Sequence, residues 1–110
     1  MEKSDPPVRY AVEYSSFVLQ HLRLLARDAS VRGDGPAFTA ALREFHRRLE
    51  LFPQFGDPIL DLSLEEGQIR LGIIRPLAMR YAVYEARRMV LCGALPILLP
   101  KARPDAEASE

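Results

Sequence analysis

Three arginines recur at intervals of five residues in the last third of this 110-residue chain, at Arg70, Arg75 and Arg80. Each guanidinium is a planar cation that can hold a carboxylate or a phosphate through two parallel hydrogen bonds. A nuclease that works without a metal places such cations on the crowded phosphate of the reaction. The three arginines are therefore the candidate catalytic residues. The same pattern is also typical of exposed strand ends, where charge solvates the edge and discourages sheet-to-sheet pairing.

A second group of residues, candidates for binding an acidic partner, overlaps with the first. It comprises Tyr81, Tyr84, Arg87 and Arg88. Side chains three positions apart in a strand point to opposite faces, so at most one of the two tyrosines faces solvent. Packing in the core and binding both remain open as roles for these rings.

The other titratable residues predict no further site. His21 and His46 fall on different predicted helices without the spacing of a metal site, so we expect no metal and no cofactor. Cys92 is the single cysteine and lies in an apolar run, which favours a buried and unreactive thiol. Four acidic residues are expected in a solvated loop, with an acid–base pair as the alternative: Asp57, Asp61, Glu65 and Glu66.

Size and composition predict a single globular domain. The chain carries 15 basic and 15 acidic residues and is 48% hydrophobic, which is typical of a globular protein without a global field that attracts nucleic acid. No apolar run approaches the roughly 20 residues of a membrane helix, and the start MEKSDPPVR lacks the pattern of a secretory signal. We therefore expect a cytoplasmic protein that contacts no membrane, with one domain at residues 9–99 and flexible tails at 1–8 and 100–110.

Hydrophobic spacing predicts the elements that must carry these residues. RYAVEYS at 9–15 alternates as a half-buried strand does, and Ser15 or Ser16 can cap the helix that follows. That helix presents one apolar stripe, and the segment SVRGDG ends it. Pro36 suits the first turn of a second helix, which has the clearest amphipathic pattern in the chain.

Three further strands are expected at residues 68–75, 79–85 and 88–95. The first two alternate, whereas the third is apolar on both faces, as a central strand is. Two helices with one apolar stripe each must bury those stripes on a sheet. The sequence therefore predicts an α+β fold: an opening strand, a helical hairpin, and then an antiparallel three-strand meander in one sheet, with the helices packed on it.

This order of elements resembles the RelE/ParE superfamily of bacterial toxins. The matching segments are YAVEYSS at 10–16, AFTAALREFHRRLELFP at 37–53 and RLGIIRPLAMRYAVYEARRMVLCGAL at 70–95. The resemblance implies the toxin component of a type II toxin–antitoxin system, neutralised by an antitoxin bound over the sheet and the helical groove. It also implies a target, which is the ribosome with its mRNA in the RelE branch and DNA gyrase in the ParE branch.

The chain departs from the pattern of the RNA-cleaving RelE branch. Ile69 and Leu71 stand where that branch has lysines, Ala78 stands at or near its arginine, and PILLPKAR replaces its late basic residue and tyrosine. A ParE-like protein that is not a nuclease is therefore favoured. The alternative is a catalytically inactive, toxin-like module for protein interaction or homodimerisation, for which the apolar tail GALPILLP at 93–100 suggests a covered edge.

Overall fold

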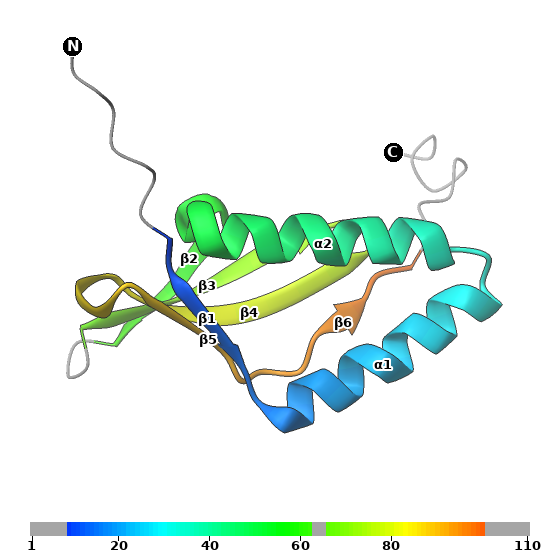
Figure 1. Ribbon diagram of the computed structural model, residues 1–110, viewed down its shortest axis with the longest axis horizontal. Coiled ribbons are helices and arrows are strands. Elements are labelled where there is room, and N and C mark those ends of the chain that lie inside the picture. The colour runs from blue at the N-terminus through cyan, green and yellow to red at the C-terminus, as the bar shows by residue number, and fades with distance from the viewer. Residues whose placement is uncertain (1–8, 63–65, 101–110) are drawn as a thin grey trace, which may run out of the picture.

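Two helices cover one face of a mixed β-sheet in the computed structural model, which describes residues 9–62 and 66–100 (Figure 1). The main elements of this part are β1 (Ala11–Tyr14), α1 (Ser16–Val31), α2 (Gly35–Leu51), β2 (Asp57–Leu62), β3 (Gly67–Ile74), β4 (Leu77–Tyr84), β5 (Met89–Cys92) and β6 (Ile97–Leu98). Two short 3-10 turns complete them, η1 (Pro53–Phe55) and η2 (Glu85–Arg87). This arrangement confirms the predicted α+β fold. The predicted tails lie outside the described residues, apart from Pro100.

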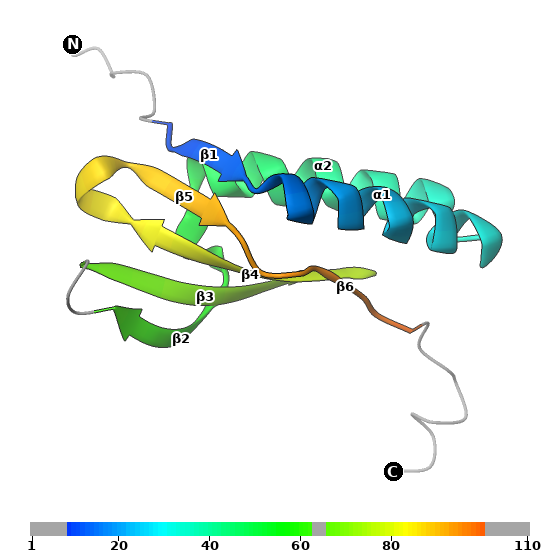
Figure 2. The same ribbon diagram turned by 90° about the horizontal axis from the view of Figure 1, so that it is seen from below.

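The sheet runs in the order β1-β5-β4-β3-β2, and β6 pairs with the end of β4 opposite to the end that β5 occupies. β3, β4 and β5 form the predicted antiparallel meander, whereas β1 lies parallel to β5. A tight turn cannot close a parallel pair, so the chain between its two members must cross over. The helical hairpin is part of this crossover, and both helices lie on the same side of the sheet (Figure 2).

Both helices begin and pack as their sequences predict. The Ser15 hydroxyl accepts a hydrogen bond from the Val18 amide at 3.1 Å, and Pro36 lies in the first turn of α2. The buried residues are Val18, Leu22, Leu25 and Ala29 in α1 and Phe38, Ala41, Phe45 and Leu49 in α2. Each set recurs every three or four positions, so each helix buries one stripe against the sheet.

The sheet meets these stripes through alternate residues of β4, namely Leu77, Met79, Tyr81 and Val83. Gly72 of β3, the register partner of Met79, lets α2 approach closely. A Cβ atom at Gly72 would lie 2.8 Å from ring atoms of both Phe45 and Phe55. A larger residue at this position would therefore push α2 away from the sheet.

The acidic segment before the meander is a strand, so the prediction of a solvated loop for residues 57–66 is wrong over most of its length. Asp57–Leu62 forms β2 and pairs with β3, and Glu65 lies outside the described residues. The register of β2 shifts between Pro58 and Leu60, and its first five residues are exposed, which is typical of an edge strand. In the sequence, the charges and the proline hid a strand whose other residues are apolar.

The last predicted strand is divided. Instead of one strand at 88–95, β5 ends at Cys92 and β6 begins at Ile97, with Pro96 buried between them. Proline has no amide proton for a strand ladder, so the strand cannot continue through it. The Cys92 thiol is buried as predicted, and burial raises its pKa to about 12, so the reactive thiolate does not form at neutral pH.

Tyr81, at the centre of the sheet, binds the segment that follows α2 through two hydrogen bonds. Its hydroxyl donates to the Pro53 carbonyl at 2.6 Å and accepts from the Gly56 amide at 3.0 Å. Its ring stacks on Phe55, with 5.8 Å between the ring centroids. Burial raises the pKa of Tyr81 to about 12, so the hydroxyl keeps its proton. One side chain thus holds both ends of the turn that leads into β2.

Removal of this hydroxyl should destabilise the fold. We expect Tyr81→Phe to lower the free energy of unfolding by about 1–3 kcal/mol, because it leaves a buried amide and a buried carbonyl without a partner. Tyr10→Phe is the control, since the Tyr10 hydroxyl is only part-buried and accepts a single hydrogen bond, from Gln54 at 3.2 Å. Urea unfolding followed by circular dichroism measures both variants. A Tyr81→Phe variant as stable as the wild-type protein would contradict this role of the hydroxyl.

Candidate functional site

The three candidate catalytic arginines do not come together. Arg70 is the register partner of Tyr81, so it shares the face of the sheet that packs on the helices. Arg80 is the partner of Leu71 and therefore lies on the other face. Arg75 sits at the turn between β3 and β4, where its guanidinium is 3.5 Å from a backbone carbonyl. Separated in this way, the three guanidinium groups do not converge on one phosphate.

The Arg70 guanidinium is occupied by the backbone that follows α2. Its Nη1 donates to the Gln54 carbonyl at 2.9 Å and to the Gly56 carbonyl at 2.5 Å. Its Nε is buried and has no hydrogen-bond partner in the part of the chain that the structure describes. These carbonyls belong to the segment that Tyr81 also holds. Arg70 therefore stabilises the entry into β2 and turns its charge away from the opposite face.

The candidate binding arginines lie at one end of the sheet, each over a tyrosine ring. The Arg87 guanidinium is 5.3 Å from the centroid of the Tyr84 ring, and that of Arg88 is 5.9 Å from the centroid of Tyr10. Tyr10 packs against the helix-side core, whereas Tyr84 lies on the other face because it is three positions from Tyr81. The two arginines thus contact rings on opposite sides of the sheet. Of the predicted tyrosines, neither faces solvent, since both are buried.

The side of the sheet away from the helices, which we call the open face, is largely apolar. The strand registers place on it Leu60, Ile69, Leu71, Ile73, Arg80, Ala82 and Leu91. Leu60 and Ile73 expose 58% and 51% of their surface. A hollow of about 480 Å³ crosses this face and is lined by residues of four strands, including Ile59, Ile69 and Leu91. Contiguous apolar surface of this kind marks a protein-interaction site more often than a bare solvent face.

Two charged side chains interrupt the open face. Arg80 stands among the aliphatic side chains of its centre, and Asp57, the register partner of Leu71, stands at its β2 edge. Across residues 9–62 and 66–100, neither side chain forms an ion pair or a hydrogen bond. They lie two strands apart, roughly 9–10 Å, which is too far for a direct contact. Both charges are therefore available to a partner.

A second apolar surface lies between the two helices, and we call it the helical groove. Two adjoining hollows of about 370 and 260 Å³ form it and share the side chains of Leu19, Leu22 and Leu42. The titratable side chains on its walls are Arg23, Arg43, His46 and Tyr14. None of them is a carboxylate, so the groove suits an apolar segment that carries carboxylates of its own.

A chain of polar contacts closes the groove at β1 and was not expected from the sequence. The Tyr14 hydroxyl is 2.7 Å from Nδ1 of His46, and Nε2 of His46 is 3.2 Å from Glu50. In a neutral ring, these contacts place the proton on Nε2, which donates to Glu50, while Nδ1 accepts from Tyr14. Burial raises the pKa of Tyr14, which keeps the phenol protonated and unsuited to act as a nucleophile. These contacts therefore join α2 to the edge of the sheet.

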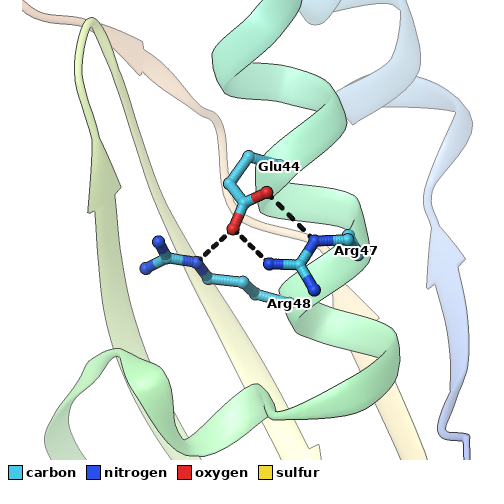
Figure 3. A network of polar contacts seen from close by, with 3 residues as sticks. All are labelled: Glu44, Arg47 and Arg48. Atoms are coloured by element: carbon cyan, nitrogen blue, oxygen red, sulfur yellow. Dashed lines mark hydrogen bonds and ion pairs between the residues drawn. The ribbon is translucent and has the colours of Figure 1, made fainter.

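Charged side chains on the polar face of α2 form ion pairs with one another. Arg47 donates from Nε and Nη2 to the two Glu44 oxygens at 3.0 and 2.7 Å, and Arg48 donates from Nε to Glu44 at 2.7 Å. Figure 3 shows the two guanidinium groups on either side of this carboxylate. The Arg48 guanidinium also lies 5.4 Å from the centroid of the Phe55 ring. The hydrogen bond from Arg47, followed by that from Arg48, lowers the pKa of Glu44 to about 2. These arginines have partners already and do not add to the helical groove.

The shifted pKa of Glu44 gives a pH-dependent contribution to stability. Its carboxylate stabilises the folded chain above its ordinary pKa of 4.5, and this stabilisation is lost as the pH falls from there toward about 2. We expect Glu44→Gln to lower Tm at neutral pH and the deficit to shrink steadily below pH 4.5. Glu13→Gln, at an exposed glutamate of β1, is the control and should show little deficit at any pH. A deficit for Glu44→Gln that stays constant over this acid range in thermal unfolding would contradict the assignment.

Three further findings bear on the kind of site. Among the residues described, no three His, Cys, Asp or Glu side chains are grouped so that they could hold a metal ion. Within the same part of the chain, no helix combines the length and the apolar character needed to cross a bilayer. Comparisons of the chain with protein-family models, with curated proteins and with solved structures return no match. A function therefore has to be argued from the surfaces described above.

Proposed function

We propose that this chain is a RelE/ParE-like toxin that acts by binding its target and does not cleave RNA. The observation that carries the proposal is the separation of Arg70, Arg75 and Arg80 over two faces and one end of the sheet. Cleavage without a metal needs a base at the ribose 2'-hydroxyl and cations on the adjoining phosphate, within hydrogen-bond reach of one another. Arginines that point away from each other do not meet this requirement.

The tyrosines do not supply the missing chemistry. The Tyr81 hydroxyl is engaged by the Pro53 carbonyl and the Gly56 amide on the helix side of the sheet. Tyr84 is buried beneath the Arg87 guanidinium. A general acid or base on the open face would have to come from elsewhere. The ParE branch, whose target is DNA gyrase, is therefore the branch we favour.

The proposed antitoxin places an amphipathic helix in the helical groove. Helix-in-groove recognition needs an apolar floor that accepts side chains at i, i+3, i+4 and i+7. Leu19, Leu22 and Leu42 offer such a floor, and Arg23 and Arg43 flank it with positive charge. We therefore expect carboxylates on both sides of the apolar stripe of the antitoxin helix. In this proposal the protein works in the bacterial cytoplasm, where its target is found.

Expression in a bacterial host tests the proposal. Induced alone, the chain should stop growth and leave the 5' ends of mRNA unchanged in primer extension, while plasmid supercoiling changes as gyrase is inhibited. Co-expression of an antitoxin, to be sought in the reading frame directly upstream of the gene, should restore growth, and Leu42→Asp in the groove should abolish this rescue. New mRNA ends within translated codons would point to a nuclease instead. Undisturbed growth at high soluble expression would contradict a toxin of either kind.

A non-toxic interaction module of the same fold is the second candidate. The open face favours this second candidate, because an apolar surface around Arg80 can bind another protein without any toxin activity. The expression experiment separates the two candidates. A module of this kind leaves growth unchanged while it forms a stable complex or a dimer in solution.

A further inference from the structure

The open face carries a charge pattern that is complementary to itself. Asp57, Leu71 and Arg80 are successive register partners across β2, β3 and β4, so they form one row on this face. Read across the strands, the row is negative, apolar and positive. A copy of the row turned by 180° about the direction of β3 reads positive, apolar and negative. Each charge then meets its opposite, and Leu71 meets Leu71.

The neighbouring row is complementary in size. Leu60, Ile69 and Ala82 are register partners on the same three strands. The same rotation sets the large Leu60 side chain over the small Ala82 side chain of the second copy, and Ile69 over Ile69. Large-to-small contacts let two sheet faces interdigitate, as the inner faces of β-sandwiches do. One rotation therefore satisfies charge in one row and shape in the next.

We propose that a second copy of this chain covers the open face, in a two-fold symmetric dimer whose axis runs along β3. Such an interface uses the same patch on both subunits, so every contact occurs twice. Its two ion pairs join Arg80 of each copy to Asp57 of the other. The proposal concerns the open face alone and does not depend on the toxin activity or on the helical groove.

Arg80 favours this occupant, because its guanidinium has no ion-pair or hydrogen-bond partner within residues 9–62 and 66–100. A purely apolar partner would take the guanidinium out of water without a counter-charge, which is strongly unfavourable. A second copy brings its own carboxylate, Asp57, to the required place through the symmetry of the pair. The open face thereby supplies both members of the ion pair, Arg80 and Asp57.

The size of the face sets the expected strength. An axis along β3 overlays β2, β3 and β4 of the two copies, because β2 is the edge of the sheet. Three strands about 4.8 Å apart and the roughly 26 Å length of β3 enclose about 370 Å² on each copy. Two such faces cover about 750 Å² together, which is the size of a weak, transient interface. We therefore expect a reversible dimer whose population rises with concentration.

Charge reversal tests the proposal through complementation between two variants. Arg80→Asp and Asp57→Arg should each weaken self-association at least about tenfold, because each places like charges together twice. Mixed in equal amounts, the two variants should form a heterodimer about as tight as the wild-type dimer. Both ion pairs are present in it: Asp57 of one variant meets Arg80 of the other with the original polarity, and the two substituted side chains meet with the charges exchanged. Sedimentation velocity over a concentration series measures all three species, with circular dichroism to confirm folding.

The control variant is Arg27→Asp, at an exposed position of α1, which should dimerise as the wild-type protein does. A wild-type chain that stays monomeric at every concentration would overturn the proposal. So would a dimer that tolerates both reversals, or two variants that remain monomeric when mixed.

Discussion

Two helices can cover only one face of this sheet, and the sheet is apolar on both faces. The core forms where Leu77, Met79, Tyr81 and Val83 of β4 meet the buried stripes of α1 and α2. On the other face, Ile73 and Leu60 remain more than half exposed, and no element of the described chain lies over them. Within residues 9–62 and 66–100 the fold is thus a two-layer unit whose second sheet face stays apolar and uncovered.

Most of the fold could be predicted from the sequence because its helices obey simple spacing. The apolar stripes of α1 and α2, the Ser15 cap and the meander β3–β4–β5 follow from residue type and period. β2 was missed because a proline and two aspartates stand among its aliphatic residues, which is a pattern that an edge strand tolerates and a loop shares. Local composition does not show whether a strand later in the sequence will pair with this segment.

The side on which β3 meets the helices was not predictable from its alternation. Ile69, Leu71 and Ile73 form the more apolar set, yet the set that contains Arg70 and Gly72 packs on the helices. Gly72 makes room for two phenylalanine rings, and Arg70 holds two backbone carbonyls beneath the helix. The close approach of the two rings to Gly72 and the hydrogen bonds of Arg70 determine which face of β3 packs on the helices. Neither contact leaves a periodic pattern in the sequence. Arg70, Arg75 and Arg80 lie apart for the same reason. They span the hairpin of β3 and β4, and the sequence does not specify which side chains of this hairpin pack on the helices.

The open face lies outside the core that the described residues form. Ile73 and Ile74 allow a direct test, since these neighbours in β3 point to opposite faces and, of the two, Ile74 packs against the core. Methyl-labelled isoleucine in dilute protein, with a soluble paramagnetic probe, reports which side chain solvent reaches. We expect strong broadening of the Ile73 methyl signals and weak broadening of those of Ile74. Equal protection of both residues, or the reverse order, would contradict it.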